Sequence, residues 1–518
     1  MVPKKIIILL LTALLPLCVH AQEEWTIQRG DCLPTGLPKQ SYANRTRLVG
    51  SHRLPTVNDQ WDATKTYKQL VVLVEFTDLS FFESHDKEFY ERVFNVFDES
   101  AYEGKRRYGQ GSVADYYRTQ SGGMLNLSFD IVGPYKVAEN AKSNDSHKRA
   151  ELREATEMMV ADQQERDFSQ YDWDNDGFVE QVVYVVAGPS GNVNGQTGYL
   201  HPNTSSFPAV TTHDGEKISN YTASTEVWLL DQNTNCGIGT ICHEFTHSLG
   251  LPDIYPTNYW CYSVCDEWDL MDGGNFTNYG WCPPNFTPIE KMLLGWLTPI
   301  ELTEPVSIVN LKPVSEGGEV YIADYYPIVE EPTDDEEQPS EARAAERINA
   351  CVLIENRQNT LWDAGTPGSG LMIWYLNYDQ SAWRNNAPNN KEGNPRFRPV
   401  YADGMDYIAW KAKIAEMGLE KNWYQNSNRM NSLYLSTSPF PFGENNAVEE
   451  CQISNITIND EGYASFDFMG GASGIKDVRN EKGEKDFYDL LGRRIENPIH
   501  GQLYLVRGQK GIIRKQVY

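Results

Sequence analysis

Residues 241–255, "ICHEFTHSLGLPDIY", constrain the fold more than any other stretch, because polar side chains recur at fixed intervals in an otherwise apolar run. On a helix, His243 and His247 project from one face, one turn apart, and both imidazoles can reach one metal ion. Glu244 follows the first histidine, where its carboxylate can take a proton from a metal-bound water. Gly250 can adopt a left-handed conformation and end the helix.

The residues after this helix offer a third ligand. The chain turns back after the glycine, and Asp253 lies six residues past His247. Three protein ligands leave the fourth position of a zinc ion open to water and substrate. Zinc lowers the pKa of that water toward about 7 and polarises the scissile carbonyl, while Glu244 acts as general base. The alternative is an amphipathic core helix with two hydrogen-bonded histidines.

The motif also resembles a known family. "HEFTHSLGLPD" is similar to the extended zinc motif of the metzincin-like peptidases, with Asp where most carry a third His. With "LMDGG", "PPNFTPIEKMLLGW" and "QLVVLVEFTD", the chain resembles the immune inhibitor A family of secreted bacterial metallopeptidases over roughly residues 69–470. The resemblance implies endopeptidase activity, one zinc and a β-rich domain after the catalytic one. It implies His243, His247 and Asp253 as ligands and Glu244 as the base.

The same resemblance suggests a methionine turn beneath the zinc. Met271 would be that methionine, and the alternative is an ordinary buried Met. Metzincins often place a tyrosine two residues later to steady the transition state, but this chain has Gly273 there. Tyr279 is a candidate by proximity in sequence alone, so the identity of the stabilising group is open.

A second metal site is suggested by "DWDNDG", residues 172–177. Asp172, Asp174 and Asp176 alternate, a glycine follows, and Glu180 comes soon after. Hard oxygen ligands at this spacing suit calcium. The twelfth loop position is Val183, so the loop is not a complete EF-hand, and the alternative is a solvated acidic turn.

The charge of the chain excludes some partners. Its 518 residues carry 45 Lys and Arg against 72 Asp and Glu, a net charge of −27. Such a chain should repel nucleic acid and anionic membranes. An apolar content of 40% is ample for a large core and indicates two or three domains.

The N-terminus has the pattern of a signal peptide over residues 1–21. Lys4 and Lys5 precede an apolar run at residues 6–17, and Ala21 provides a small residue before the cut. The run is too short for a comfortable membrane span, and no other stretch is long enough. We therefore expect a protein that is secreted or exposed at the cell surface.

Residues 22–66 are expected to form an N-terminal arm or short propeptide. Asp31 or Cys32 is a candidate to occupy the open zinc position and hold the enzyme latent, and the alternatives are a disulfide or a plain arm. Removal of the signal leaves eight of the nine cysteines, which permits disulfides in an exported chain. One or two disulfides or buried thiols are favoured over a zinc site at the clustered Cys261, Cys265 and Cys282.

The pattern of elements predicts an α+β fold. Strands are expected at residues 69–76, 125–137 and 178–188 and helices at 112–123 and 148–166. These belong to a mixed-sheet zinc peptidase domain at residues 67–297, which contains the active-site helix. Short strand-like runs at 305–311, 318–326, 349–356, 370–378 and 463–470 then predict an antiparallel β-rich domain at residues 298–470. A charged segment at residues 329–347 is expected to be an acidic surface loop.

The last 48 positions, residues 471–518, are expected to form a small C-terminal β module. The stretch "FYDLLGRRIENPIHGQLYLVRGQKGIIRKQVY" resembles the sorting module of the Bacteroidota type IX (Por) secretion system. The alternative is a β appendage without a sorting role.

Taken together, the sequence favours a secreted, monomeric zinc endopeptidase that hydrolyses peptide bonds in proteins or peptides. One alternative is an exported adhesin or glycan-binding protein on an inactive peptidase scaffold, although such a protein has no reason to keep the base. The other is an amidase that acts on cell-wall peptides with the same zinc chemistry.

Overall fold

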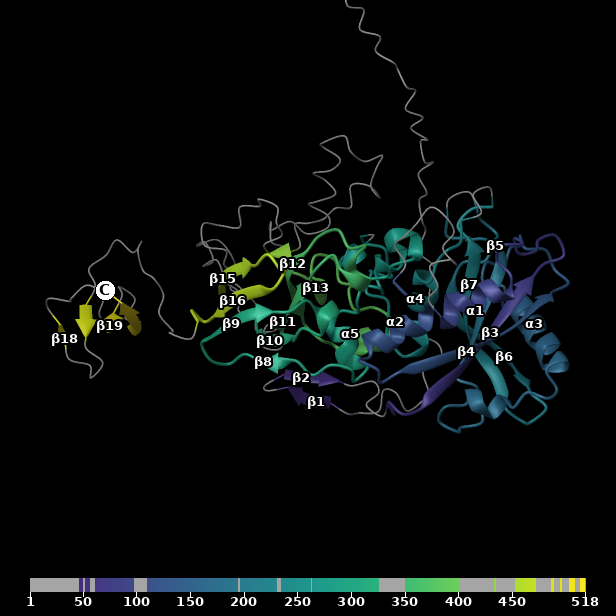
Figure 1. The fold of residues 1–518 in the computed structure, drawn as a ribbon, viewed down its shortest axis with the longest axis horizontal. Coiled ribbons are helices and arrows are strands. Elements are labelled where there is room, and N and C mark those ends of the chain that lie inside the picture. The colour runs from purple at the N-terminus through teal and green to yellow at the C-terminus, as the bar shows by residue number, and fades with distance from the viewer. Residues whose placement is uncertain are drawn as a thin grey trace, which may run out of the picture.

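A computed structural model describes residues 61–96, 110–193, 196–230, 234–261, 263–325, 350–400 and 452–471, together with short strands outside these ranges. The first half of the chain is built on a five-stranded mixed sheet with the order β4-β3-β5-β7-β6 (Figure 1). All neighbouring strands run parallel except the edge strand β6, which is antiparallel to β7. The strands are β3 (Thr66–Glu75), β4 (Asn126–Lys136), β5 (Val182–Pro189), β6 (Asn203–Thr211) and β7 (Lys217–Val227).

Helices cover both faces of this sheet. Alternate residues of β3 point to opposite faces, as the period of a strand requires. Leu70 and Val72 pack toward α3 (Arg149–Asp162), whereas Val71 and Leu73 pack toward the helices of the other face. Those helices are α1 (Lys87–Asn95), α2 (Val113–Gln120) and α4 (Gly239–Ser248).

Most elements expected before the motif are present. Strands β3, β4 and β5 and helix α2 lie where the hydrophobic pattern predicts them, and Ser112 caps α2 in a capping box with Asp115. Helix α3 ends at Asp162, earlier than expected, and a 3-10 turn, η2 (Phe168–Tyr171), follows.

Strands β6 and β7 and helix α1 were not predicted. Strand β7 is hidden in the sequence because Ser224, Thr225 and Glu226 are polar, yet all three are buried. The Glu226 carboxylate stays buried because it accepts hydrogen bonds from the backbone N–H groups of Phe82 and Gly188 and contacts His85 Nδ1 at 2.8 Å. The hydrogen-bond partners of Glu226 lie far from it in the sequence, so the local hydrophobic pattern could not predict its burial.

The second half is rich in strands, as expected. A six-stranded sheet has the order β13-β12-β11-β10-β8, with β14 also paired to β12, and a three-stranded sheet has the order β15-β16-β9. All pairs are antiparallel except β8 with β10. The strands are β8 (Ile300–Glu301), β9 (Val306–Leu311), β10 (Tyr321–Asp324), β11 (Cys351–Arg357), β12 (Gly370–Leu376), β13 (Phe397–Pro399), β14 (Leu433–Tyr434), β15 (Ile453–Ile458) and β16 (Ala464–Phe468).

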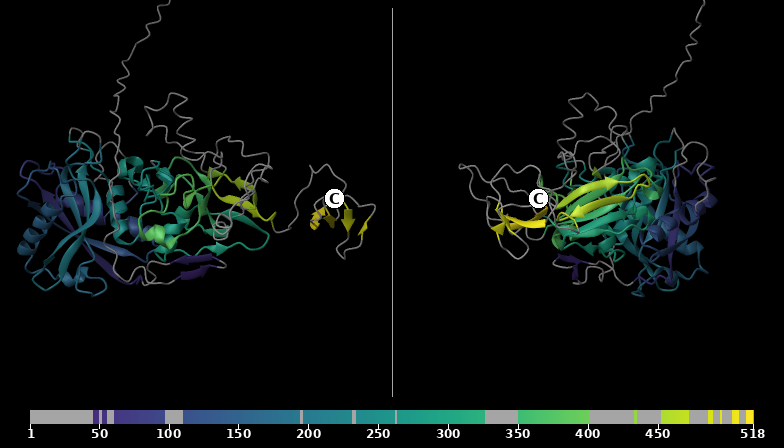
Figure 2. Two further views of the ribbon diagram at one scale, coloured as in Figure 1. Left: turned by 180° about the vertical axis from the view of Figure 1, so that it is seen from behind. Right: turned by 60° about the vertical axis from the view of Figure 1, so that its left-hand side comes forward.

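One hydrophobic cluster joins the two halves. Phe245 of α4 and Ile289 of α5 (Pro288–Leu293) belong to the same cluster as Leu353 of β11 and Trp374 of β12. Figures 1 and 2 show the motif helix between the two large sheets, with the purple and blue strands on one side and the green strands on the other. The domain limit expected at residue 297 falls between α5 and β8 and stays a prediction.

The remaining described elements are short. The 3-10 helices are η3 (Asp266–Trp268), η4 (Gly274–Gly280), η5 (Val314–Glu316) and η6 (Leu361–Asp363), and α7 (Gln380–Arg384) follows β12. Strands β1 (Thr46–Val49) and β2 (His52–Pro55) form a hairpin. The last four strands form an antiparallel sheet: β17 (Asp486–Tyr488), β18 (Arg494–Ile495), β19 (Leu503–Arg507) and β20 (Ile513–Val517).

Several sequence expectations fall outside the described residues. These are the signal peptide, the Asp31 and Cys32 latency candidates and the acidic loop at residues 329–347. Within the described ranges, no helix is long and apolar enough to cross a membrane. The cysteines described there are all buried thiols: Cys236, Cys242, Cys261, Cys265, Cys282 and Cys351.

Candidate metal centre

Helix α4 carries the motif through the middle of the molecule. It starts at Gly239, where a Cβ atom would lie 2.0 Å from the Asn275 carbonyl oxygen, so no larger residue fits. Gly250, with a φ of 108°, follows the helix and turns the chain back. His243 is 4% exposed and His247 is fully buried. The expected helix and its glycine stop are both present.

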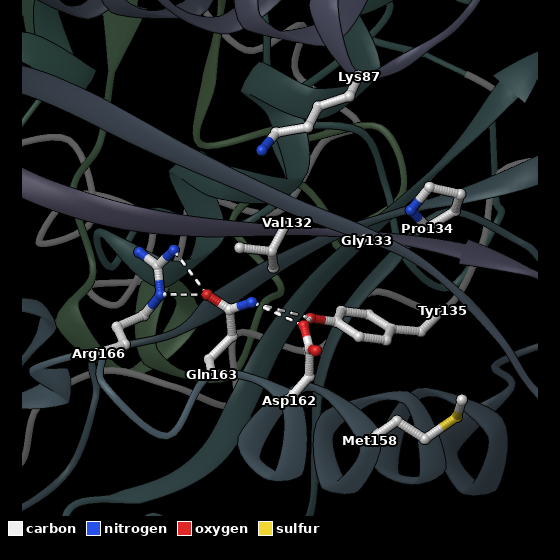
Figure 3. A pocket seen from close by; sticks show the side chains of 9 residues that line it. All are labelled: Lys87, Val132, Gly133, Pro134, Tyr135, Met158, Asp162, Gln163 and Arg166. Atoms are coloured by element: carbon white, nitrogen blue, oxygen red, sulfur yellow. Dashed lines mark hydrogen bonds between the residues drawn. The ribbon is translucent and has the colours of Figure 1, made fainter.

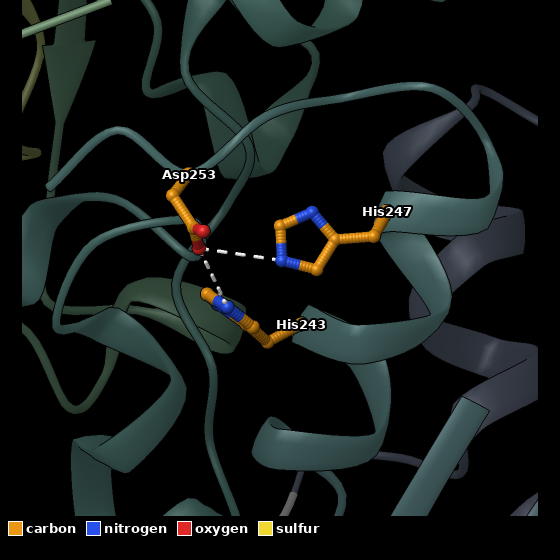
Figure 4. A group of neighbouring side chains, drawn as sticks. All are labelled: His243, His247 and Asp253. Carbon is orange, nitrogen blue, oxygen red and sulfur yellow. Dashed lines mark ion pairs between the residues drawn. The ribbon is translucent and has the colours of Figure 1, made fainter. Parts of the chain in front are cut away.

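The structure brings Asp253 to the two histidines, as Figure 4 shows. Its Oδ1 atom lies 3.2 Å from His243 Nε2 and 3.3 Å from His247 Nε2. The three side chains form a buried cluster whose candidate ligand atoms all lie within 4.8 Å of one another. The spacing inferred from the sequence thus corresponds to a real convergence in space.

The outer nitrogens of both histidines are held by backbone carbonyls. His243 Nδ1 lies 2.8 Å from the Leu270 carbonyl oxygen, and His247 Nδ1 lies 2.8 Å from the Leu251 carbonyl oxygen. A carbonyl oxygen only accepts, so each Nδ1 carries the proton and donates it. In its neutral form, each imidazole then presents the lone pair of Nε2 to Asp253. Metal-binding histidines typically donate their other ring nitrogen to a carbonyl or carboxylate oxygen in this way.

A cation fits this donor set. His247 Nε2 and Asp253 Oδ1 are both buried, and neither makes a hydrogen bond. Two imidazole lone pairs facing one carboxylate oxygen repel each other unless protons or a metal ion lie between them. Two nitrogens and one carboxylate oxygen form a donor set that suits zinc.

The electrostatics of the cluster favour its charged forms. Burial lowers the pKa of His247, but the Asp253 carboxylate, together with Glu244, outweighs that effect and raises the pKa to about 9. Burial raises the pKa of Asp253, but His247 and His243 outweigh it and hold the pKa well below its usual range. The cluster therefore keeps a carboxylate and attracts positive charge.

Glu244 lies one residue beyond the first histidine and is 3% exposed. Thr204 of the edge strand β6 contacts its carboxylate, with Thr204 Oγ1 3.2 Å from Glu244 Oε2. The same hydroxyl lies 2.6 Å from the Glu244 backbone carbonyl oxygen. Strand β6, which the sequence pattern did not predict, therefore supports the candidate base.

The segment around Met271 contacts His243 and the residue that follows Asp253. The carbonyl of Leu270 accepts the His243 hydrogen bond, and the carbonyl of Met271 accepts a 2.8 Å bond from the N–H of Ile254, next to Asp253. The Met271 side chain is fully buried in the shared core. This placement is compatible with the expected methionine turn.

Tyr255 contacts the candidate site through its ring. Its ring is nearly parallel to the His243 imidazole, with 6.5 Å between ring centroids. Tyr279 lies in η4 with a φ of 60°, and its backbone carbonyl accepts a hydrogen bond from Trp228 Nε1. A role for Tyr279 at the oxyanion stays a prediction.

Asn386, which lies in the β-rich half after α7, is a further residue of the site that the sequence did not predict. Its Nδ2 donates to Asp253 Oδ2 at 2.7 Å, and its Oδ1 accepts from the Asp253 backbone N–H at 2.6 Å. No sequence motif indicates that Asn386 belongs to the site, because 133 positions separate it from Asp253.

Three of the four candidate calcium ligands come together. Asp172, Asp174 and Asp176 offer carboxylate oxygens within 4.8 Å of one another, but Glu180 is not part of that group. Both oxygens of Glu180 instead accept from the Trp173 backbone N–H at 2.7 Å. Several aspartate oxygens likewise accept backbone bonds within the turn, so the loop is also consistent with a plain acidic turn.

A separate pocket lies at the other edge of the sheet, beside β4 and α3 (Figure 3). Tyr135, Asp162 and Gln163 join in hydrogen bonds across it, and Arg166 donates to Gln163. No residue predicted to act in catalysis or metal binding lines this pocket.

The fold and the site define a class: an α+β domain in which two histidines of one helix and an aspartate that follows it form a buried candidate metal cluster. Residues 57–292, less than half of the chain, match the family model described as immune inhibitor A peptidase M6, catalytic domain. This match supports a metallopeptidase.

Relatives among characterised proteins point the same way. The chain is similar to the pre-pro-metalloprotease PrtV of Vibrio cholerae serotype O1, in strains M66-2 and ATCC 39315 / El Tor Inaba N16961. In each case the identity is 24% over 281 residues, which covers 44% of this chain. The alignment spans only 30% of the length of these relatives.

Proposed function

We propose that this protein is a zinc-dependent endopeptidase that hydrolyses peptide bonds in proteins. The observation that carries the proposal is the buried convergence of His243, His247 and Asp253, in which His247 Nε2 and Asp253 Oδ1 make no hydrogen bond. The match to a peptidase family model and the similarity to a metalloprotease support it.

His243, His247 and Asp253 would hold the zinc through Nε2, Nε2 and Oδ1. When bound, zinc supplies Lewis acidity, which makes water a nucleophile near neutral pH and polarises the scissile carbonyl. The backbone carbonyls of Leu270 and Leu251 hold the imidazole rings in the required tautomer. Burial of all three side chains strengthens their electrostatic attraction for a cation.

Glu244 would act as the general base. It would take a proton from the attacking water and later give that proton to the leaving amine. Its position on α4, next to His243, places its carboxylate at the same helix turn as the first ligand. Thr204 limits the freedom of that carboxylate by its contact from β6.

The proposal extends to location and partners. We infer from the N-terminal signal pattern that the protein is exported and is secreted or exposed at the cell surface. We further infer that it acts as a monomer on protein or peptide substrates. The sorting role of residues 471–518 belongs to the same proposal, supported by the resemblance of the tail sequence. A structural calcium at Asp172, Asp174 and Asp176 is a further part, supported by the grouping of their carboxylates.

The test pairs zinc content with cleavage of a quenched casein, for the native protein and for Glu244→Gln. We expect one zinc in both proteins and a loss of cleavage by a factor of about 10² to 10⁴ in the variant only. Zinc in both proteins without cleavage by the native one would favour the glycan-binding alternative. A panel that adds cell-wall peptides would identify an amidase. Absence of zinc from the native protein would refute the metal site.

A further inference from the structure

We infer that Asn386 is the positioning residue of the third metal ligand, so that the β-rich half completes the metal centre of the peptidase half. The inference rests on the proposed zinc site and identifies which group, outside the motif, sets the geometry of Asp253. It concerns the orientation of a ligand and not the chemistry of the reaction.

Asn386 makes two hydrogen bonds with Asp253. The Asn386 amide accepts from the Asp253 backbone N–H at 2.6 Å and donates to Asp253 Oδ2 at 2.7 Å. With Oδ2 occupied in this way, Oδ1 is the oxygen that faces His243 and His247, at 3.2 and 3.3 Å. The amide thereby determines which carboxylate oxygen is available to a metal ion and fixes the plane of the carboxylate.

The chemistry of the pair calls for an amide. The backbone N–H of Asp253 needs an acceptor and its Oδ2 needs a donor, and an Asn side chain supplies both without adding charge. A carboxylate at position 386 would keep the acceptor but would set a second negative charge against Oδ2. Asn386 also has a φ of 53°, a left-handed conformation that Asn tolerates better than most residues.

The segment that carries Asn386 is itself fastened to the loop after Asp253. The Thr257 hydroxyl donates to the Asn386 carbonyl at 2.8 Å, and the Trp260 indole donates to the Asn389 carbonyl at 2.7 Å. Asn389 donates to the Ile254 carbonyl at 2.8 Å. The two segments therefore form one hydrogen-bonded unit around the third ligand.

Asn389 connects this unit to the β-rich sheet. Its amide exchanges two hydrogen bonds with the backbone of Phe397 in β13, at 2.8 and 2.9 Å. Asn386 is 3% exposed and Asn389 is fully buried, so water does not compete for these bonds. A continuous path of contacts runs from strand β13 to Asp253 Oδ1, and the second half of the chain is coupled to the metal centre through it.

The experiment uses the full-length protein and three variants. Asn386→Asp keeps the shape and the acceptor but loses the donor to Oδ2, and Asn386→Gly removes the amide while tolerating the positive φ. Asn390→Asp is the matched control, because Asn390 lies in the same segment and bonds Thr257, but does not touch Asp253. Zinc affinity is measured by competition with a chromogenic chelator, and the visible absorption of bound Co²⁺ reports the ligand geometry.

We expect both Asn386 variants to bind zinc about 10- to 100-fold more weakly than the native protein, as is usual when a residue that hydrogen-bonds a metal ligand is lost. Their Co²⁺ spectra should change, whereas Asn390→Asp should match the native protein in both measurements. If Asn386→Asp does not fold, Asn386→Gly decides the question alone.

Two results would overturn the inference while leaving the proposed function intact. One is native zinc affinity and an unchanged Co²⁺ spectrum in Asn386→Gly. The other is an equal loss of affinity in Asn390→Asp, which would indicate a general loosening of the loop. A native protein that binds no zinc would instead refute the proposed function, and the inference with it.

Discussion

The hydroxyl of Thr204 lies 2.6 Å from the backbone carbonyl oxygen of Glu244 and 3.2 Å from its carboxylate oxygen Oε2. The single hydroxyl proton is shared between these two acceptors, with the carbonyl at the shorter distance. This contact joins the antiparallel edge strand β6 to the helix that carries the metal-binding histidines. It holds the backbone and the side chain of the candidate base at once.

Replacement of Thr204 by valine should therefore lower kcat. Valine keeps the shape but removes the hydroxyl, which should reduce kcat roughly tenfold and the free energy of unfolding by about 0.5–1.5 kcal/mol. The measurements are casein-peptide kinetics and urea unfolding of the zinc-loaded protein.

Thr222→Val is the matched control for this prediction. Thr222 lies opposite Thr204 in the β6–β7 register, and its hydroxyl contacts the Glu244 backbone carbonyl at 3.3 Å but not the carboxylate. We expect a similar loss of stability with kcat nearly unchanged. Equal losses of kcat in both variants would show that Thr204 acts only through the fold.

Glu180 should make the stability depend on pH. Burial raises the pKa of its carboxyl to about 8, above the value of 4.5 expected in the unfolded chain. Below about pH 4.5 both states are protonated, and as the pH rises toward 8 the unfolded state alone loses its proton. The free energy of unfolding should thus decrease between these pH values.

The comparison for this prediction is Glu180→Gln, which cannot ionise but can still accept from the Trp173 N–H. Urea unfolding of calcium-free protein at pH 5, 6, 7 and 8 should give a smaller decrease for the variant than for the native chain. Identical pH profiles for the two proteins would contradict the prediction.

Calcium, if it binds the aspartate turn, should stabilise the protein by mass action. A ligand present at 100 times its Kd adds about 2.7 kcal/mol to the free energy of unfolding, so the Tm should rise by several degrees. The measurement is the Tm of zinc-loaded protein with calcium and with magnesium. Asp174→Asn should lose most of the calcium-dependent rise, and an unchanged native Tm would favour the plain acidic turn.

Arg357 should be important for stability. Its guanidinium is fully buried and pairs with Glu355 at 3.1 Å and with Asp363. Arg357→Met would leave both carboxylates buried without their cation, at a cost of about 3–5 kcal/mol. Chemical unfolding at neutral pH measures this loss.

The control is Arg153→Met, which breaks an exposed ion pair with Glu157. Loss of an exposed pair costs about 0–1 kcal/mol. If the two substitutions cost the same, burial would not be the reason for the importance of Arg357.

Local pattern was sufficient for much of the fold. Strands β3 and β5 are continuous apolar runs, and α2 has a capping serine at its start, so neighbouring residues contain the information. Strand β7 was not predicted because its buried polar residues are stabilised by hydrogen-bond partners that lie far away in the sequence. The parallel pairing of β8 with β10 also departs from the antiparallel pattern expected of the second half.

The candidate site divides in the same way. The sequence by itself determined that His243 and His247 share a helix face and that Asp253 follows a turn, because a helical period and a glycine stop act within about a dozen residues. Only the tertiary structure decided that Thr204 meets Glu244 and that Asn386 orients Asp253. Those contacts join segments that are distant in the sequence, and they exist because the packing of two sheets around α4 brings them together.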